Sequence, residues 1–144
     1  MKPIYSDPML WGKHVWKTME IFACTLNYEN KHHIFDFLEK LQYLLPCPTC
    51  RGHYKEYFQK KSPHRHMKSP IDLLRWIHEL QGEIRRRQQR EDKNLSFEDY
   101  LDSVISSFDV PEVYYYFDQE NRYKEYLKLC DVPLDEISLL KVMP

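Results

Sequence analysis

Apolar side chains recur every three or four residues along most of the chain, which is the spacing that places them on one face of an α-helix. Two such stretches occupy residues 8–27 and 30–45. Pro46 ends the second, because proline has no N–H to donate and disfavours the helical conformation in the residue before it. We therefore predict two helices in the first third of the chain, each with one buried face.

Local start signals predict three further helices. Pro48 suits the first turn of a helix that continues to about residue 60, and a polar loop over residues 62–70 follows it. Ser69-Pro70-Ile71-Asp72 combines a capping serine, a proline and an acidic residue, and it predicts a fourth helix. Ser96-Phe97-Glu98-Asp99 has a similar pattern and predicts a short fifth helix that ends near residue 108.

These elements predict an all-α protein, built as a four-helix bundle with a short fifth helix over residues 1–108. A boundary at Asp109-Val110-Pro111 separates the bundle from a C-terminal helical extension over residues 109–144. Tyr116 and Tyr123 lie at helical spacing in that extension. A tyrosine-rich helix of this kind either forms a protein interface or packs back on the bundle.

Composition and charge exclude several classes of partner. The chain has 144 residues and a net charge of -1, so no global field draws it to nucleic acid or to acidic lipid. It contains no run of about 18 apolar residues, so we expect no membrane-spanning helix and no membrane partner. The first residues lack the apolar core of a signal peptide, and the expected location is the cytoplasm.

The candidate chemistry lies in the sequence LLPCPTCRGHY at residues 44–54. Only Cys47 and Cys50 are close in sequence among four cysteines, and such a pair in a cytoplasmic chain more often serves redox chemistry or metal binding. Cys47 should lie at the start of a helix, where unpaired N–H groups and the helix dipole stabilise a thiolate. Positive charge from Arg51 and His53 would lower its pKa further.

Two other interpretations of the cysteine pair stay open from the residues alone. A zinc site would need His53, or the histidines of His64-Arg65-His66, which lack the usual spacing of three to five residues. No second CxxC pair is present to complete such a site, so we predict no metal. Alternatively, the two cysteines are small apolar residues at a helix start.

Several motifs also occur in a fixed order around the cysteine pair. They are Trp11-Gly12, Trp16-x-x-Met19 with Ala23 and Tyr28, Leu45-Pro46-Cys47-x-x-Cys50 with His53 and Tyr54, and Trp76. This arrangement resembles the Erv/ALR family of FAD-linked sulfhydryl oxidases over roughly residues 11–100, and it is most similar to the compact viral members.

The resemblance implies a helical bundle that holds FAD, with the cysteine pair against the isoalloxazine ring. It assigns to Cys47 the exchange with thiols of client proteins and to Cys50 the attack on the flavin, which passes electrons to oxygen. It also implies a homodimer formed through the first two helices. The residues that it places at the cofactor are Trp11, Gly12, Trp16, His53, Trp76, Gln81, Ile84 and Arg85.

The chain departs from the family pattern where the family holds the nucleotide part of FAD. The first-helix motif Trp-x-x-Leu-His-x-x-Ala has Glu20 in place of histidine, and a carboxylate there would repel a pyrophosphate. The fourth-helix motif His-Asn-x-Val-Asn is replaced by Gln81-Gly82-Glu83-Ile84-Arg85. The arginines at positions 85–87 either supply phosphate contacts instead or form the solvated end of the helix.

Two functions are consistent with this sequence. One is a thiol oxidoreductase that forms disulfides in client proteins of a host cytoplasm or virion through Cys47 and Cys50, with electrons passed to FAD and oxygen where flavin is bound. The other is a flavin-less structural or assembly protein, for example a virion component. It would keep the family shape and use the cysteine pair as a staple or an exchange site.

Overall fold

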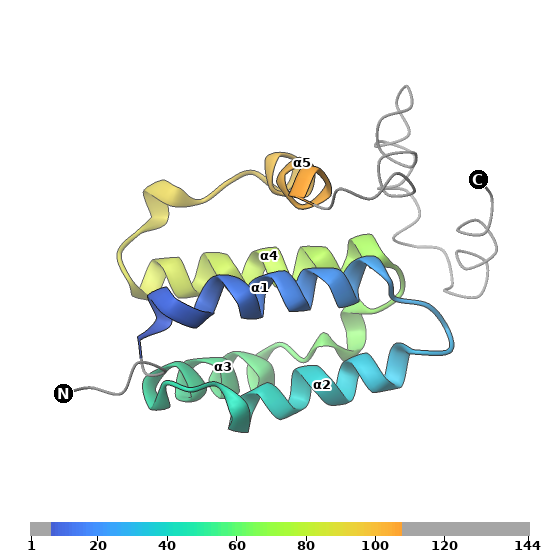
Figure 1. Cartoon of the computed structure of the whole chain (residues 1–144), viewed down its shortest axis with the longest axis horizontal. Helices are drawn as coiled ribbons and strands as arrows, with labels where there is room; N and C mark the ends of the chain where they lie inside the picture. The colour runs from blue at the N-terminus through green and yellow to red at the C-terminus, as the bar shows by residue number, and fades with distance from the viewer. Residues whose placement is uncertain (1–6, 108–144) are drawn as a thin grey trace.

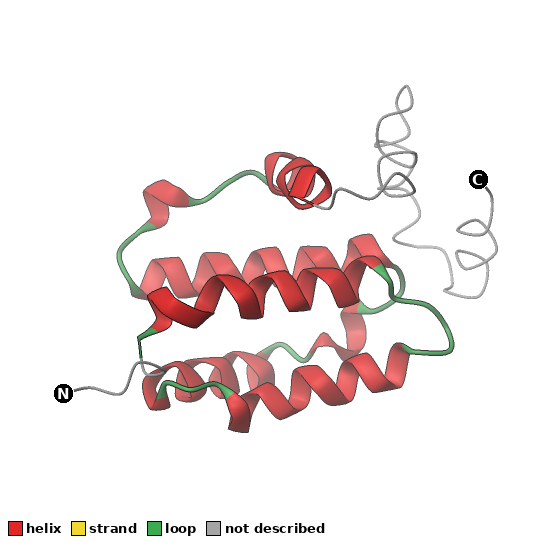
Figure 2. Cartoon of the chain, in the orientation of Figure 1, coloured by secondary structure: helices red, strands yellow, loops and turns green. Residues whose placement is uncertain are grey.

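The computed structural model describes residues 7–107, and the predicted extension over residues 109–144 lies outside the described part. The five α-helices of that part are α1 (Pro8–Cys24), α2 (Lys31–Leu44), α3 (Pro48–Lys60), α4 (Pro70–Arg87) and α5 (Phe97–Ser107) (Figure 1). Two short 3₁₀ turns, η2 (Pro63–His66) and η3 (Glu91–Lys93), flank α4. Residues 7–107 contain no strand, and the all-α prediction is confirmed (Figure 2).

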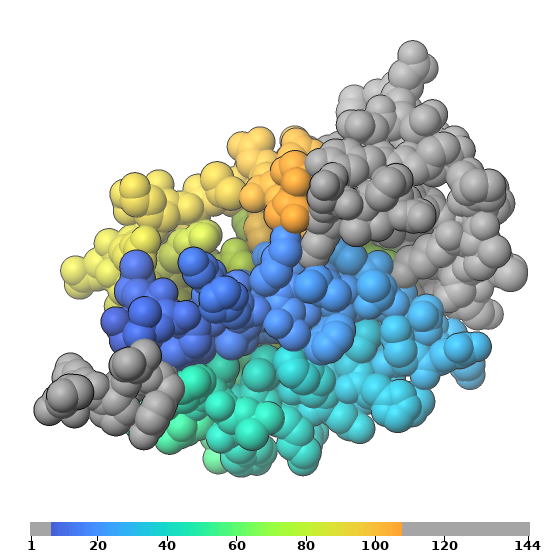
Figure 3. Space-filling model, viewed as in Figure 1, coloured from blue at the N-terminus to red at the C-terminus, as the bar shows by residue number. Residues whose placement is uncertain are grey.

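The helices form two pairs and one crossing helix. α1 packs along α4 and α2 packs along α3, so four amphipathic helices meet in one bundle. α5 contacts α4 and is seen almost end-on in Figure 1, because it runs across the long axis of the bundle. The starts of α1 and α3 and the last turn of α4 lie at the same end of the bundle. On the face shown in Figure 3, α1 (blue) and α2 (cyan) both lie at the surface.

Three helices begin in the same way, with a capping side chain followed by proline. Asp7 and Ser69 accept backbone N–H groups of the first turn at 3.0 and 3.1 Å in α1 and α4. In α3 the cap is Cys47, whose Sγ accepts the N–H of Cys50 at 3.3 Å. Each cap satisfies one of the N–H groups that a helix start leaves unpaired. The predicted starts at Pro48 and Ser69 are confirmed.

Two predicted boundaries differ from the structure. α1 ends at Cys24 rather than near residue 27, because the side chain of Asn27 accepts two backbone N–H groups and forms a turn there. The segment 62–70, predicted as a polar loop, contains η2, and its Pro63 and Met67 are buried. This segment therefore contributes to the core.

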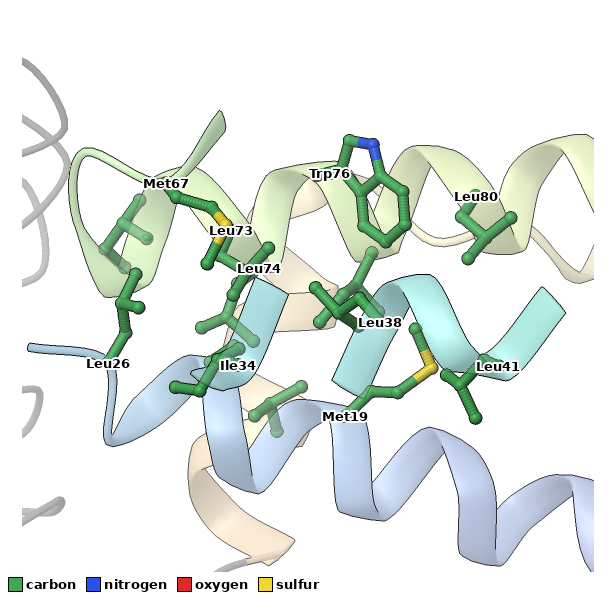
Figure 4. Packing of buried hydrophobic residues seen from close by; sticks show 14 of the residues in the cluster. Met19, Leu26, Ile34, Leu38, Leu41, Met67, Leu73, Leu74, Trp76 and Leu80 are labelled. Carbon is green, nitrogen blue, oxygen red and sulfur yellow. The ribbon is translucent and has the colours of Figure 1, made fainter. Parts of the chain in front are cut away.

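The core lies between α1, α2 and α4. Met19, Leu38, Leu41, Trp76 and Leu80 converge there, and all of them are buried (Figure 4). Burying one side chain of this size stabilises a fold by roughly 1.5–3 kcal/mol. The bundle therefore has a continuous apolar centre that fixes the relative positions of these helices.

Two polar bonds fix α3 on this core. Tyr54 Oη donates to the carbonyl oxygen of Leu38 at 2.6 Å and so links α3 to α2. Trp76 Nε1 donates to the carbonyl oxygen of Lys61 at 2.8 Å, directly after α3 ends. The rings of Tyr54 and Trp76 also meet edge to face, with centroids 6.5 Å apart. The helix that carries the cysteine pair is thus held at its middle and at its C-terminal end.

Candidate functional site

The cysteine pair occupies the first turn of α3. Cys47 is the cap residue, with an extended backbone at φ -92° and ψ 123°, and Pro48 begins the helix. The backbone N–H of Cys50 donates to Cys47 Sγ, and the Cys50 thiol donates to the same sulfur. Both cysteine side chains are half-buried. The sulfur of Cys47 therefore accepts two hydrogen bonds from within its own turn.

The two thiols differ in pKa because of their places on this turn. Burial alone would raise the pKa of Cys47, but the Cys50 thiol, the N–H groups of Cys50 and Thr49, and the charge of Arg51 lower it below its usual value. Burial comes first among the causes that raise the pKa of Cys50 to about 12, followed by its hydrogen bond to Cys47 and the charge there. Cys47 is therefore the sulfur that ionises, and Cys50 keeps its proton.

Arg51 holds a positive charge close to the pair. Its Nη1 donates to the carbonyl oxygen of Leu45 at 2.7 Å, and its backbone N–H donates to the carbonyl oxygen of Cys47 at 2.9 Å. Leu45 is buried, so the guanidinium bridges the bend at Pro46 and ties the preceding chain to α3. His53, the other cation predicted here, is half-buried on the same helix and forms no hydrogen bond to either sulfur in the described part.

At the same end of the bundle, α1 has a hydrogen-bond donor without a partner in the described part, and both α1 and α4 have glycines with open space beside them. The indole Nε1 of Trp11 is buried and has no hydrogen-bond partner within residues 7–107. A Cβ added to Gly12 or Gly82 would meet no atom within 4 Å, so packing inside the chain does not require either glycine. Gly82 nevertheless costs about 1 kcal/mol relative to alanine in a helix. These positions leave room for a ligand or a partner.

The remaining aromatic and aliphatic candidates belong to the core. Trp76 is fully buried, and its ring lies against Tyr57 with centroids 5.6 Å apart. It has no exposed face to offer a ligand, and this placement favours the core interpretation. Trp16 and Ile84 are half-buried and pack against the same core.

Glu20, which stands where the family has histidine, is the centre of a polar cluster formed by three helices. Its Oε2 accepts a hydrogen bond from Tyr100 Oη at 2.8 Å and one from Gln81 Nε2 at 3.4 Å. Gln81 and Tyr100 are only 8% and 4% exposed, and Glu20 is half-buried. Burial raises the pKa of Glu20, although both hydrogen bonds and the charge of Lys17 oppose the rise. We call Glu20, Gln81 and Tyr100 the Glu20 cluster.

Tyr100 is the member of this cluster that the sequence analysis missed. The start of α5 at Ser96 was predicted, and the N–H of Asp99 does donate to Ser96 Oγ at 3.1 Å. No local signal, however, indicates that a tyrosine of α5 reaches a carboxylate 80 positions earlier. The one available hint is the replacement of a family histidine by Glu20, since a carboxylate on a half-buried helix face needs donors.

The arginines at the end of α4 are largely paired within the chain. Arg86 lies 2.6 Å from Glu83, and Arg87 lies 3.3 Å from Glu83 and 3.0 Å from Glu56. These ion pairs favour the interpretation of this segment as a solvated helix end. Arg85 is half-buried and forms none of these pairs, and its charge acts on the tyrosine of the Glu20 cluster.

The described residues fit only part of the FAD that the resemblance implies. The unpaired indole of Trp11 and the open space at Gly12 are compatible with a flat polar ring. At the nucleotide positions, Gln81 already donates to Glu20, and a carboxylate is a poor neighbour for a pyrophosphate. The nucleotide half of FAD therefore does not fit these residues. Within residues 7–107, no three side chains of the histidine, cysteine, aspartate and glutamate types gather as a metal site.

Alkylation should distinguish the two thiols of the reduced chain. At neutral pH, iodoacetamide is expected to modify Cys47 first and to leave Cys50 largely unmodified. The reason is that the pKa of Cys47 lies below that of a free thiol and the pKa of Cys50 lies above it. Arg51→Gln should move the midpoint of the Cys47 rate profile up by roughly 0.7 of a pH unit, since a nearby charge in water contributes on the order of 1 kcal/mol. Timed quenching followed by peptide mass spectrometry measures both effects.

Lys55→Gln is the matched control, because it removes a cation from the same helix that lies over the ring of Tyr43 instead of beside the pair. Equal modification rates for Cys47 and Cys50 would contradict the assignment of the two thiols. An equal midpoint shift in the Arg51 and Lys55 variants would contradict the role given to Arg51.

The pH dependence of stability should reveal the buried carboxyl of Glu20. Folding raises its pKa above the ordinary value of 4.5, so ionisation costs stability as the pH rises from the unfolded pKa through the folded one. Glu20→Gln keeps an oxygen that accepts both hydrogen bonds and cannot ionise. The melting temperature of this variant minus that of the wild type should increase as the pH rises from about 4 to 7. A constant difference across this range would show that Glu20 does not titrate as stated.

Comparison with known proteins agrees with this geometry. The model of the Erv1 / Alr family matches residues 13–103, a range that includes the cysteine pair and the Glu20 cluster. No curated protein and no solved structure matches the chain. No helix in the described part is long and apolar enough to cross a membrane. Because the family match covers more than half of the chain, this protein belongs to the Erv1/Alr family.

Proposed function

We propose that the chain is a thiol oxidoreductase that forms disulfides in client proteins through Cys47 and Cys50. The observation that carries the proposal is the asymmetry of the pair at the start of α3, where Cys47 caps the helix and its Sγ accepts the N–H of Cys50 at 3.3 Å. In agreement with this geometry, the pKa of Cys47 is lowered and that of Cys50 is raised. Such a pair separates the sulfur that exchanges with a client from the sulfur that closes the disulfide. Membership of the Erv1/Alr family supports a sulfhydryl oxidase-like reaction.

Two exchange steps move an electron pair from a client dithiol to the oxidised pair. A client thiolate attacks Cys47 Sγ, the bond between Cys47 and Cys50 breaks, and Cys50 leaves as a thiolate that takes up a proton because its pKa is high. The second client thiolate attacks the client sulfur of the mixed disulfide and displaces Cys47. A low pKa of the leaving thiol speeds this second step. The client ends with a disulfide, and the pair ends reduced.

FAD is the electron acceptor that the family implies, because its members commonly bind this cofactor. When bound, FAD supplies a two-electron acceptor. Trp11 and Gly12 have the unused capacity to lie against its ring, whereas Glu20 and Gln81 do not fit its nucleotide. The proposed reaction is therefore described only as far as the reduction of the cysteine pair.

A second candidate is a flavin-less structural or assembly protein with the same bundle. The observation that favours it is the Glu20 cluster, whose polar groups are satisfied inside the chain at positions where the family holds its nucleotide. In that case the cysteine pair would act as a staple or an exchange site within an assembly.

Stoichiometric oxidation of a dithiol tests the proposed function. The oxidised full chain, mixed anaerobically with excess dithiothreitol, should oxidise about one equivalent, because one disulfide accepts one electron pair. Cys47→Ser and Cys50→Ser should lose this activity. In a separate reaction without dithiothreitol, Cys47 of the Cys50→Ser variant should attack oxidised glutathione, release one glutathione thiol and stay trapped as the mixed disulfide. Thiol titration and intact-mass spectrometry measure these outcomes.

Cys24→Ser is the matched control, since Cys24 lies on α1, outside the first turn of α3. It should oxidise the same single equivalent as the wild type. Dithiol oxidation that persists in both active-site variants would place the redox centre elsewhere. A wild-type chain that is inert toward dithiols would favour the assembly candidate.

We also propose that two copies pair through α1 and α2. Ile21 of α1 and Tyr43 and Leu44 of α2 are exposed, and both helices lie on the face shown in Figure 3. Exposed apolar side chains on surface helices are the usual material of a homodimer interface. The pairing expected from the family would cover this face.

Sedimentation of the full chain tests the pairing. Ile21→Glu should shift the wild-type dimer toward monomer, with a dissociation constant about tenfold higher or more because a charge would be buried in the interface. Leu95→Glu is the matched control, because Leu95 is exposed to a similar extent, 43% against 41% for Ile21, but lies outside α1 and α2. A wild-type chain that sediments as a monomer, or equal effects of both variants, would contradict the pairing.

A further inference from the structure

We infer that the Glu20 cluster occupies the place of the family's nucleotide contacts, so that the cysteine pair passes its electrons to a second disulfide and not to FAD. This inference rests on the proposed function and names the class of its electron acceptor. It concerns three residues from three helices: Glu20 of α1, Gln81 of α4 and Tyr100 of α5.

The cluster is a satisfied polar network. A single carboxylate oxygen, Oε2 of Glu20, accepts from Tyr100 at 2.8 Å and from Gln81 at 3.4 Å. Both donors are buried, so each loses a partner that water replaces poorly when its bond to Glu20 is broken. A nucleotide that used Gln81 or the space at Glu20 would first have to break these bonds. Each broken bond to a charged group weakens such binding by about tenfold.

The charge at Glu20 opposes a nucleotide as well. A pyrophosphate placed near this carboxylate would meet a like charge in a half-buried environment, where screening by water is weak. Arg86 and Arg87 do not offset this repulsion because they pair with Glu83, and the charge of Lys17 already acts on the carboxylate of Glu20. The charge of Arg85 acts on Tyr100 of the cluster.

Contacts between α4 and α5 beside the cluster also hold Tyr100 in position, so moving it would require breaking them. His78 Nε2 lies 2.7 Å from the carbonyl oxygen of Leu95, and its ring lies 5.1 Å from the ring of Tyr100. The guanidinium of Arg75 lies 4.8 Å from the centre of the Phe97 ring. These contacts hold the first turn of α5 in place over α4.

The reaction balances without a flavin. The thiolate of Cys47 attacks one sulfur of an acceptor disulfide, whose bond breaks and whose second sulfur leaves as a thiolate that takes up a proton. Cys50 then gives up its proton and attacks Cys47 Sγ in the mixed disulfide, and the remaining acceptor thiolate leaves. The acceptor gains two electrons and two protons and becomes a dithiol, and the cysteine pair becomes a disulfide again.

Two measurements on the same full-length protein test this inference: whether it binds FAD, and whether its electrons pass to a disulfide or to oxygen. The purified chain should carry no flavin absorbance, and added FAD should show no saturable change in fluorescence. With dithiothreitol as donor and oxidised glutathione as acceptor, turnover above the uncatalysed rate should be equal in air and under argon. A yellow protein with stoichiometric FAD, or turnover that requires oxygen, would overturn the inference.

A set of substitutions tests the cluster itself. The combined variant Glu20→His, Gln81→His, Gly82→Asn and Arg85→Asn restores the family pattern, and the open space at Gly82 accepts the added side chain. It should gain FAD affinity by about a hundredfold or more. If circular dichroism shows that it does not fold, the pair Glu20→His and Tyr100→Phe is measured instead and should gain affinity in the same direction.

Ser103→Ala is the matched control, because Ser103 lies on the same helix as Tyr100 but its side chain is exposed. It should leave flavin binding at the wild-type level. Folded variants that gain no FAD affinity would contradict the role of the cluster. Cys47→Ser separates the two proposals: loss of exchange by this variant supports the proposed function and leaves the flavin result unchanged. A wild type that binds FAD tightly and still exchanges thiols overturns only the present inference.

Discussion

The first turn of α3 depends on one interaction, the hydrogen bond in which the sulfur of Cys47 accepts the N–H of Cys50. Every helix start leaves N–H groups unpaired, and α1 and α4 satisfy theirs with the oxygens of Asp7 and Ser69. A neutral thiol is a weak acceptor, whereas a thiolate at this position faces several N–H groups and the positive end of the helix dipole. The cap and the ionisation of Cys47 therefore stabilise each other.

This arrangement requires the rest of the bundle to hold α3 when the sulfur changes its state. In a disulfide, the sulfur of Cys47 carries no charge and caps the helix less well. Tyr54 and Arg51 do not take part in the exchange, and their bonds to the carbonyl oxygens of Leu38 and Leu45 bind α3 to α2 and to the chain before it. The buried bond of Tyr54 is the stronger restraint, because no water competes for its partners. The site can thus change its redox state on a helix of fixed position.

The parts of this structure that sequence reasoning predicted are those encoded within a few neighbouring residues. A cap followed by proline predicted the start of α4 at Ser69, and Pro48 predicted the start of α3 between the two cysteines. The end of α1 was predicted too late, because the competing turn depends on how the side chain of Asn27 bonds. The Glu20 cluster could not be predicted, since its bonds join residues 61 and 80 positions apart and require the packing of three helices.

The side chains at positions 20, 81 and 100 form one network, and the two departures at positions 20 and 81 act together within it. The resemblance places Glu20 and Gln81 where the family has histidines, and considered singly each replacement would remove a contact to a ligand. Within the fold, Glu20 without Tyr100 would be a poorly satisfied carboxylate, and Gln81 without Glu20 would leave a buried amide short of a partner. An unsatisfied buried group costs roughly 1–3 kcal/mol, so each residue favours the other two. An internal network can therefore hold α1, α4 and α5 together where the family pattern places a ligand, and the bundle keeps its shape although its motif has changed.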